Sequence, residues 1–302
     1  MKPAPLVPPA EAVPDPGFDP FALVRGELAE VEQELARGGS SDVAAIPAII
    51  EHLRRSGGKR IRPALVLLAG QMCRCPAQAR IRLAAVVEML HAATLIHDDI
   101  IDEAATRRGQ PSTNARWGNS RSVLAGDWLY MQAFRLALGE RSFPILDALI
   151  ALTQTMVEGE LMQLEMQARV VSAAEHRNLI ERKTARLFQV AAQLGAMAAG
   201  APAPEIAALG RYGRHLGLAF QMVDDILDFT ATAEVLGKPV GNDLREGKMT
   251  LPAIHAHAAS APAQRELFER VLRESGYGSV SFEQIRELVT RDGALERARR
   301  ET

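Results

Sequence analysis

Apolar residues recur at the three- and four-residue spacing of an α-helix along most of this chain. Several of these segments are apolar on nearly every side, so we expect them to lie in the middle of a bundle. The alternation that is typical of strands is hard to find between the turn residues. The pattern therefore predicts an all-α protein with helices over residues 21–35, 46–53, 64–72, 81–101, 122–138, 145–166, 179–194 and 206–229.

The arrangement of these helices gives no sign of a second domain. The chain has 302 residues, of which 47% are hydrophobic, and no change of composition divides it. The first twenty residues contain seven prolines and no apolar run, a composition that is typical of an extended or disordered arm. We therefore predict a single helical domain over residues 21–302, preceded by an arm over residues 1–20.

Charge and cysteine content narrow the class of protein. The formal net charge is -2 and the sequence pI is about 6.4, which excludes the broad basic field of a nucleic-acid-binding protein. No apolar run reaches the roughly 18 residues of a membrane span. Cys73 and Cys75 lie too close together, and too far from any histidine cluster, for a disulfide framework or a zinc site. We expect a soluble protein of the reducing cytoplasm, with no transmembrane segment and no nucleic-acid partner.

One acidic pattern, Asp-Asp-x-x-Asp, occurs twice, each time near the C-terminal end of a long apolar helix. Its carboxylates are those of Asp98, Asp99 and Asp102, and of Asp224, Asp225 and Asp228. Positions i and i+4 share one face of a helix, so the first and last carboxylates of each motif point to the same side. One such motif alone is more readily a solvated helix end, but two copies after buried-looking helices favour a binding site.

The chemistry of the two motifs favours a hard metal ion. Carboxylates at the C-terminal end of a helix oppose its dipole, and they are costly beside apolar residues unless a cation compensates. Oxygen ligands without Cys or His favour Mg²⁺ over zinc. Because Mg²⁺ is usually held by one or two carboxylates together with substrate phosphates, two facing motifs predict a diphosphate bound between Mg²⁺ ions.

Cationic residues lie before and after the acidic motifs, where they could bind the phosphate groups of a substrate. Arginine binds phosphate through two parallel hydrogen bonds and lysine acts as a point charge. Any one of these residues is also readily a solubilising surface charge, most of all Arg60. His91, on the first acidic helix, is a further candidate diphosphate ligand, whereas His97 is equally well explained as a core residue. The cationic candidates are Lys59, Arg60, Arg62, Arg107, Arg108, Lys183, Lys238 and Lys248.

In combination, these motifs resemble those of the trans-isoprenyl diphosphate synthases, and among them the long-chain enzymes that make quinone side chains. The resemblance runs from about residue 57 to residue 252. It rests on Gly-Gly-Lys-Arg-Ile-Arg-Pro at 57–63, His-Asp-Asp-Ile-Ile-Asp at 97–102 and Phe-Gln-Met-Val-Asp-Asp-Ile-Leu-Asp at 220–228. Shorter blocks at 107–109, 125–127, 183–185 and 237–250 follow in the order of that family.

The resemblance implies a fold, a metal site and an assembly. The fold would be the isoprenoid synthase fold, a single large helical bundle around a central apolar tunnel, and the protein would be a homodimer. Asp98, Asp102 and Asp224 would hold Mg²⁺ on an allylic diphosphate. Their supporting carboxylates would be those of Asp99, Asp225 and Asp228.

The resemblance also implies which residues contact the two substrates. The allylic diphosphate would be contacted by Arg107, Lys183 and Lys248, with Lys238 nearby. Isopentenyl diphosphate would be held by Lys59, Arg62, His91 and Arg108. The polar groups beside the reacting carbons would be Thr184 and Gln221. The allylic diphosphate would depart, and the isopentenyl double bond would attack the carbocation-like carbon before a proton is lost.

Product length is predicted from the face of the first acidic helix, because in this family the product grows down the tunnel beside it. Ala93 lies five residues before Asp98, and a side chain this small leaves the tunnel open. We therefore expect an octaprenyl to decaprenyl product, made from farnesyl or geranylgeranyl diphosphate. A plug formed by Met89, Phe134 or another helix would instead give a geranylgeranyl product. Relatives continue beyond the position of Thr302, so we expect this domain to lack its last C-terminal helices.

Three alternatives belong to other functional classes. A terpene cyclase has no need of a second diphosphate site such as Lys59, Arg62 and Arg108. A non-catalytic subunit of a heteromeric synthase would be expected to lose acids from one motif, and here both motifs are complete. A metal-dependent phosphohydrolase built on His97 and Asp98 would need further metal-ligating histidines. In the sequence, no convincing acidic partner stands beside His52, His176, His215, His255 or His257.

Overall fold

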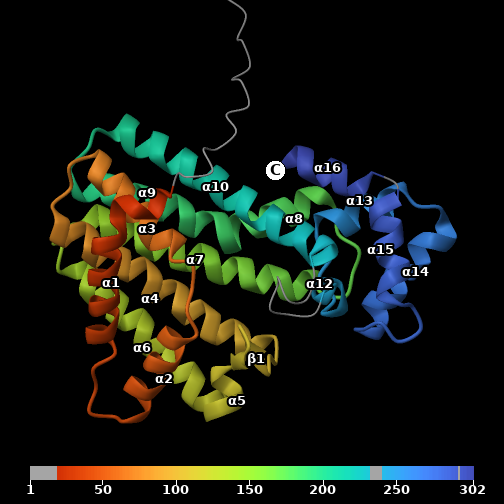
Figure 1. Ribbon diagram of the computed structural model, residues 1–302, viewed down its shortest axis with the longest axis horizontal. Helices are drawn as coiled ribbons and strands as arrows, with labels where there is room; N and C mark the ends of the chain where they lie inside the picture. Colours follow the sequence, from red (N-terminus) through yellow and green to blue (C-terminus); the bar gives the residue numbers. More distant parts are fainter. Residues whose placement is uncertain (1–18, 232–239, 292) are drawn as a thin grey trace, which may run out of the picture.

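The computed structural model describes residues 19–231, 240–291 and 293–302. The all-α prediction is confirmed, because the strands among these residues form one short antiparallel hairpin of β1 (Thr106–Arg107) and β2 (Gln110–Pro111). Residues 1–18 of the arm predicted over residues 1–20, and the predicted ligand Lys238, lie outside the described residues. In the part of the chain that is described, no helix is long and apolar enough to cross a bilayer. Figure 1 shows the order of the elements along the chain.

The first group of helices surrounds α4 and shares one apolar core. The side chains of Leu83, Leu90 and Phe188 are almost fully buried in it. The backbones of α3 and α9 pack so closely at Gly70 and Gly195 that a side chain at Gly195 would not fit. A Cβ there would lie 2.5 Å from the backbone nitrogen of Gly70. The group comprises η1 (Pro20–Val24), α1 (Arg25–Gly38), α2 (Ala45–Arg55), α3 (Ile61–Met72), α4 (Ala77–Ile101), α6 (Asn119–Leu138), α7 (Phe143–Met166) and α9 (Arg186–Ala198).

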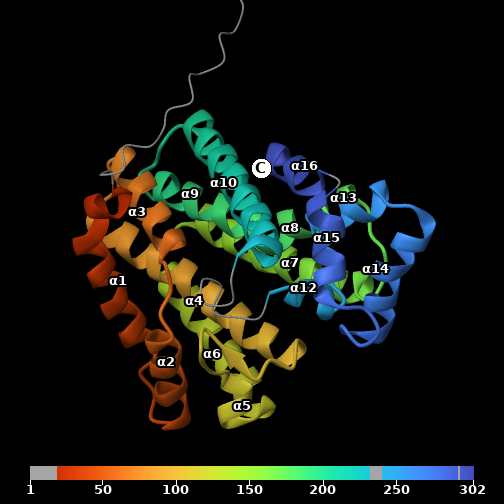
Figure 2. The ribbon, with the colours of Figure 1, turned by 45° about the vertical axis from the view of Figure 1, so that its right-hand side comes forward.

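The second group packs around its own apolar core, in which Phe229, Phe268 and Ile285 are buried. Figure 2 shows these C-terminal helices beside the end of the long helix α10 (Ala203–Thr230), which packs on α9 along its first half. The acidic ends of α4 and α10 therefore lie where the two groups meet. The group comprises α8 (Ala173–Ile180), α12 (Asn242–Arg245), α13 (Leu251–Ala259), α14 (Pro262–Glu274), α15 (Phe282–Arg291) and α16 (Ala294–Glu301).

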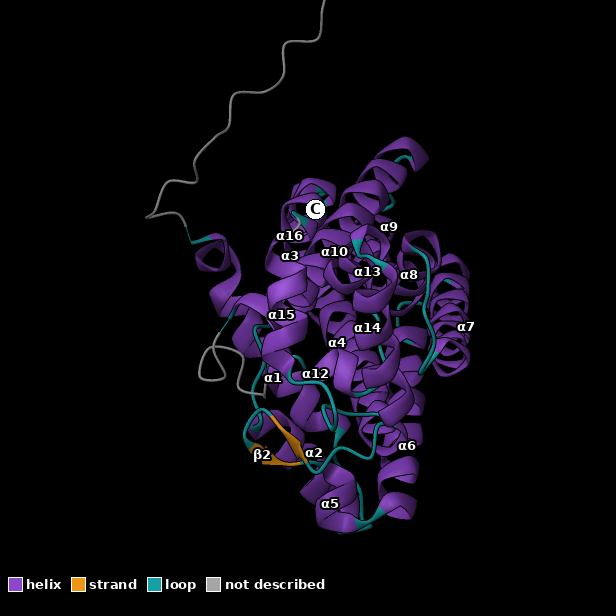
Figure 3. Ribbon diagram, turned by 90° about the vertical axis from the view of Figure 1, so that its right-hand side faces the viewer, coloured by secondary structure: helices purple, strands orange, loops and turns teal. Residues whose placement is uncertain are grey.

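Two local departures from helical regularity lie near this junction. The β1–β2 hairpin, shown in Figure 3, follows the end of α4 and leads into α5 (Thr113–Trp117), whose first turn is capped by the Ser112 hydroxyl. The helix predicted over residues 179–194 is interrupted by the π-helical turn η2 (Glu181–Ala185). Such turns are frequent at functional sites because they re-aim side chains within a helix.

Candidate active site

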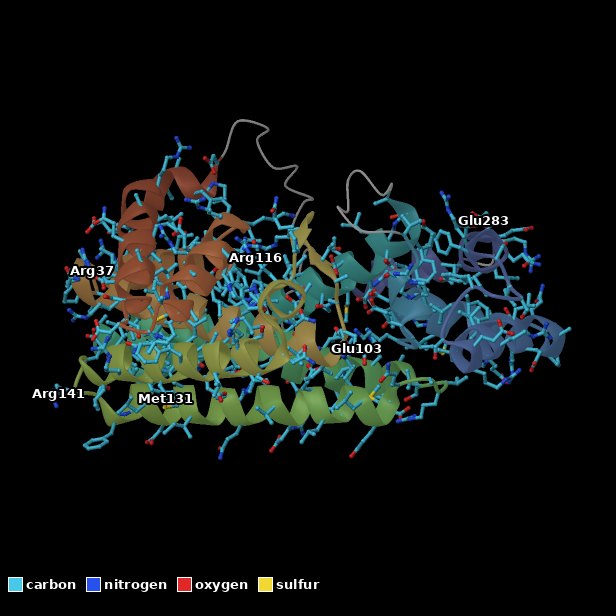
Figure 4. All side chains as sticks on the ribbon, turned by 90° about the horizontal axis from the view of Figure 1, so that it is seen from below. Arg37, Glu103, Arg116, Met131, Arg141 and Glu283 are labelled. Carbon is cyan, nitrogen blue, oxygen red and sulfur yellow. The ribbon has the colours of Figure 1, made fainter. Side chains whose placement is uncertain are left out.

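A cavity of about 1180 Å³ lies between α4, α6, α7, η2, α10 and the β1–β2 hairpin. This volume exceeds the roughly 300–1,000 Å³ of ordinary small-molecule pockets. Asp98 and Asp102 line it from α4 and its C-terminal cap, and Asp224 lines it from α10. Figure 4 shows Glu103, which follows the first acidic motif, near the middle of the molecule between the two groups of helices.

The first acidic motif is surrounded by cations that come from other elements. Lys248 Nζ donates to Asp102 Oδ1 at 3.0 Å, and Lys183 Nζ lies 3.8 Å from Asp98 Oδ2. Asp99 is almost fully buried, and its Oδ1 lies 2.7 Å from both Nε and Nη2 of Arg107. The predicted diphosphate ligands Arg107, Lys183 and Lys248 therefore lie within reach of the predicted metal ligands.

The electrostatics of this cluster are dominated by burial. Burial raises the pKa of Asp98 to about 7, with further increases from the neighbouring charges of Glu160 and Asp102 and a partial offset from Lys183. Burial lowers the pKa of Lys248, but the carboxylates of Asp102 and Glu246 outweigh it and hold the pKa above its usual range. A buried carboxylate next to other carboxylates is the kind of group that a divalent cation stabilises.

The second acidic motif is divided between the cavity and the protein interior. Asp224 lines the large cavity, whereas Asp225 and Asp228 are buried and do not line it. Asp228 accepts hydrogen bonds from the backbone N–H groups of Asn242 and Asp243 at 3.2 and 3.3 Å. The carboxylate of Asp228 thus ties the end of α10 to the start of α12.

Lys183 and Thr184 are both carried by the π-helical turn η2. The turn approaches α7 so closely that a Cβ on Gly159 would lie 3.1 Å from the backbone nitrogen of Lys183. Thr184 Oγ1 donates to Gln221 Oε1 at 2.9 Å, and Gln221 Nε2 donates to Asp225 Oδ1 at 3.1 Å. The two predicted polar groups beside the reaction centre are therefore in contact and connect η2 to the second motif.

Glu160 is a site residue that the sequence analysis missed. It lines the large cavity from α7, and its Oε2 lies 2.5 Å from Lys183 Nζ, which also donates to Gln163 Oε1 at 3.1 Å. The available signal was weak: an acid and an amide three residues apart, which places both on one face of a helix that also carries Glu158 and Glu165. Glu160 holds Lys183 at the edge of the acidic cluster.

A second cationic group forms another part of the cavity wall. Arg62 Nη1 lies 3.0 Å from His91 Nε2, and the Arg62 guanidinium stacks 4.7 Å from the ring centre of Phe188. Burial lowers the pKa of Arg62 to about 10, with Arg108 lowering it further against an increase from Glu88. Burial also lowers the pKa of His91, as do the charges of Arg62 and Arg108. Two predicted ligands thus lie in direct contact.

The glycine-rich segment before α3 contacts Arg108 of the β1–β2 hairpin and places its own cations, Lys59 and Arg60, in different environments. Arg108 lines the cavity and donates to the carbonyl of Gly57, whose φ of +71° is the left-handed conformation that favours glycine. Lys59 is exposed and does not line the large cavity. The interpretation of Arg60 as a surface charge is wrong. Its Nε and Nη1 lie 2.6 and 2.5 Å from carboxylate oxygens of Glu32 and Glu88, which satisfies the guanidinium inside the fold.

The histidines have acidic partners that were not visible in the sequence. His176 lies 3.0 Å from Asp225, His255 lies 3.0 Å from Glu301 and His257 lies 3.2 Å from Glu269. The expectation that these histidines lack acidic partners is therefore wrong, because each partner lies on a different helix and is brought close only by the fold. These pairs do not assemble further: among the described residues, no three His, Cys, Asp or Glu side chains form a metal-holding group.

The donor set that lines the cavity fits Mg²⁺ that is shared with a phosphate ligand. Asp98, Asp102 and Asp224 supply hard oxygens from two helices, and Mg²⁺ needs only one or two carboxylates when phosphate oxygens and water complete its shell.

Comparison with known proteins decides the family. The family model described as polyprenyl synthetase matches residues 43–289. The chain belongs to the polyprenyl synthetase family. It is thus a prenyltransferase, and its all-helical bundle is the isoprenoid synthase fold.

Relatives within the family match almost the whole chain. The octaprenyl diphosphate synthase of Escherichia coli (strain K12) is 38% identical over 91% of this chain and 85% of its own length. An all-trans-nonaprenyl-diphosphate synthase (geranyl-diphosphate specific) from Rhodobacter capsulatus is 39% identical over 92% of this chain and 85% of its own length. A polyprenyl synthase structure from Caulobacter crescentus CB15, complexed with calcium and isoprenyl diphosphate, has a TM-score of 0.88 and 39% identity, and the match covers 92% and 85% of the two chains.

Proposed function

We propose that this chain is a Mg²⁺-dependent polyprenyl diphosphate synthase that adds isopentenyl diphosphate units in succession, head to tail and in trans geometry, to an allylic diphosphate. The observation that carries the proposal is the junction of the two acidic helices. Asp98, Asp102 and Asp224 line one cavity together with Lys183 and Lys248. The names of the relatives, which are octaprenyl and nonaprenyl diphosphate synthases, support the reaction class.

The chain's own residues divide the substrate binding between two places. Lys183, Lys248 and Arg107 hold the allylic diphosphate beside the first acidic motif, and Arg62, His91 and Arg108 hold the diphosphate of isopentenyl diphosphate. Arginine and lysine at these places stabilise the negative charge that grows on a departing diphosphate. Bound Mg²⁺ would add positive charge at the same phosphate oxygens.

The reaction needs no side-chain nucleophile. The allylic C–O bond breaks with its electron pair leaving on the diphosphate, and the isopentenyl double bond supplies the pair for the new C–C bond. The proton then lost from the isopentenyl unit goes to the released diphosphate. Thr184 and Gln221 place oxygen atoms beside the positive carbon, and the apolar cavity wall excludes the water that would quench it.

We propose a long product, in the octaprenyl to decaprenyl range, which the names of the relatives support. Such a product would extend past the present cavity floor, and the residues predicted to set its length do not form that floor. Ala93, Met89 and Phe134 do not line the large cavity, and Ala93 and Met89 are almost fully buried by neighbouring helices. The cavity wall carries Thr94 from α4 and Tyr130 from α6 instead.

Tyr130 is the bulky candidate for the cavity floor. Among the α6 residues that line the cavity it is the farthest along the chain, and its ring centre lies 5.8 Å from that of His97. The His97 ring in turn fits against Gly126, where a Cβ would lie 2.2 Å from Nε2. The farnesyl or geranylgeranyl chain of the primer would extend toward this pair of rings.

We further propose a homodimer in the cytoplasm, whose product serves quinone side chains. Exposed apolar side chains recur every seventh residue on α6 and α7, a stripe suited to a second copy of this chain. The two cysteines are free thiols, as a reducing compartment requires. The stripe consists of Leu124, Met131 and Leu138 on α6 and of Phe143, Ile150, Val157 and Leu164 on α7. Glutamate in place of Leu124 and Met131 should yield monomers in light scattering.

The reaction is tested by incubating purified protein with Mg²⁺, labelled isopentenyl diphosphate and farnesyl diphosphate, and by sizing the dephosphorylated products. Asp98→Ala and Asp224→Ala should abolish elongation, and Asp147→Ala, an exposed acid on α7, is the matched control. Tyr130→Ala should lengthen the product if the ring is the floor. Products that stop at geranylgeranyl would overturn the proposed length, and folded protein that elongates no allylic primer would favour the non-catalytic subunit.

A further inference from the structure

A smaller cavity of about 190 Å³ lies behind the second acidic motif, between α7, α8 and the segment from α12 to α13. It is separated from the large cavity by side chains that line both of them, among them Lys183, Gln221 and Lys248. Asp225 lines this smaller cavity and not the large one. The second motif therefore presents one carboxylate to the large cavity and its neighbour to the smaller one.

His176 reaches Asp225 from the first turn of α8. Both side chains are almost fully buried, and His176 Nε2 lies 3.0 Å from Asp225 Oδ2. The start of α8 is fixed by a capping box, in which Ser172 and Glu175 exchange hydrogen bonds between side chain and backbone. Asp225 is thus held from two sides, by Gln221 on its own helix and by His176 on α8.

Three buried polar atoms in this smaller cavity lack a hydrogen-bond partner among the described residues. They are His176 Nδ1, Thr250 Oγ1 and Asp225 Oδ2, whose 3.0 Å contact with His176 Nε2 is an ion-pair contact without hydrogen-bond geometry. Buried polar groups are normally satisfied, and a cavity of this size is large enough for several water molecules that would bridge these atoms. The contact between His176 and Asp225 therefore belongs to a buried polar cluster that lines the smaller cavity together with Lys183 and Lys248.

We propose that His176 is a positioning residue for Asp225 and, through it, for the metal ion held by Asp224. This rests on the proposed function. Asp224 and Asp225 are adjacent on α10, so fixing the Asp225 carboxylate in the interior fixes the rotation that presents Asp224 to the large cavity. Groups that orient metal ligands in this way typically change metal affinity by about 10–100-fold when they are removed.

The test compares three variants of the 302-residue protein. His176→Leu removes the contact, and His176→Gln keeps a hydrogen-bond donor at the same place. His257→Gln disrupts a comparable pair with Glu269 on α13 and α14, away from both cavities. Each is measured for the Mg²⁺ concentration that gives half-maximal elongation, for the rate at saturating Mg²⁺, and for Mn²⁺ binding by electron paramagnetic resonance in the presence of methylene bisphosphonate.

We expect His176→Leu to raise both the Mg²⁺ requirement and the Kd for Mn²⁺ by about 10–100-fold, with a much smaller loss of rate at saturating metal. His176→Gln should restore part of the affinity, and His257→Gln should leave it unchanged. Unchanged metal binding in folded His176→Leu, or an equal shift in His257→Gln, would overturn the inference. If His176→Leu does not fold, the deciding variant is His176→Gln, and unchanged metal binding in that variant would overturn the inference.

Failure of the proposed function gives a different result. In that case the unaltered protein elongates no primer, while Mn²⁺ binding still reports on His176. A double variant supplies a further check: once Asp225→Asn has removed the carboxylate, His176→Leu should cause no additional loss of metal affinity.

Discussion

The two acidic motifs have the same spacing and different surroundings. In the first motif, Asp98 and Asp102 meet lysines that line the large cavity, and Asp99 is buried against Arg107. In the second motif, Asp224 lines the large cavity, while Asp225 and Asp228 are used inside the protein. The comparison shows that equivalent positions of a repeated motif can have different roles. One carboxylate faces the cavity, and another stabilises the fold.

The largest effect should come from the carboxylates that line the large cavity in each motif. We expect Asp98→Asn and Asp224→Asn to lower kcat by about 10²–10³-fold, the usual cost of removing one group that stabilises transition-state charge. Single-turnover elongation measures this directly. A much smaller loss for Asp224→Asn than for Asp98→Asn would contradict the proposed role of Asp224 as a metal ligand.

The next largest effect should separate Asp228 from the other carboxylates. Asp228→Ala leaves the buried N–H groups of Asn242 and Asp243 without this acceptor, so the free energy of unfolding should fall by about 2 kcal/mol. Urea unfolding without metal or substrate provides the measurement, with Asp147→Ala as control. An unchanged midpoint would mean that Asp228 does not hold α12 in place.

A smaller effect is expected for Lys248, which bonds to Asp102 and Glu246. Lys248→Met removes one charged contact to the allylic diphosphate, worth about 1.5 kcal/mol, so KM for that substrate should rise by roughly tenfold. KM for isopentenyl diphosphate, which is held elsewhere, should change little. Equal increases in both KM values would contradict the division of the two substrates.

The smallest effect concerns α8, which carries His176. Hydrogen bonds from the backbone and hydroxyl of Ser172, and then from Arg169, lower the pKa of Glu175 to about 2. Because the folded-state pKa is depressed below 4.5, this carboxylate stabilises the fold above that pH, and its contribution is lost as the pH falls toward 2. Ser172→Ala should cost about 1 kcal/mol and weaken this pH dependence, as followed by thermal unfolding between pH 2 and pH 6.

Long helices and charged motifs could be predicted from the sequence because their signals are local. The helix predicted over residues 81–101 is α4, Ala77–Ile101, and the one predicted over residues 145–166 is α7, Phe143–Met166. The short helices after residue 250 were not predicted. Their apolar faces are only a few residues long and are completed by partners distant in the chain, as in the contact between α13 and α16.

The features of the site that could not be predicted from the sequence depend on tertiary contacts. Arg60 carries the same charge as Arg62, but only the folded chain shows that Glu32 and Glu88 neutralise it. The π-helical turn that carries Lys183 has no local sequence signal. Ala93 lies on the predicted helix but faces a neighbouring helix, because rotation about the α4 axis is set by packing against α6.

The lysines of the active site already have carboxylate partners within the chain, since Lys183 contacts Glu160 and Lys248 contacts Asp102 and Glu246. If the two lysines bind diphosphate as proposed, each ammonium group exchanges a carboxylate for a phosphate when substrate enters. The carboxylates of Glu160, Asp102 and Glu246 then lose their counterion, and a divalent metal ion can replace it. Diphosphate and divalent metal should therefore bind with positive cooperativity, each lowering the concentration at which the other half-saturates the protein.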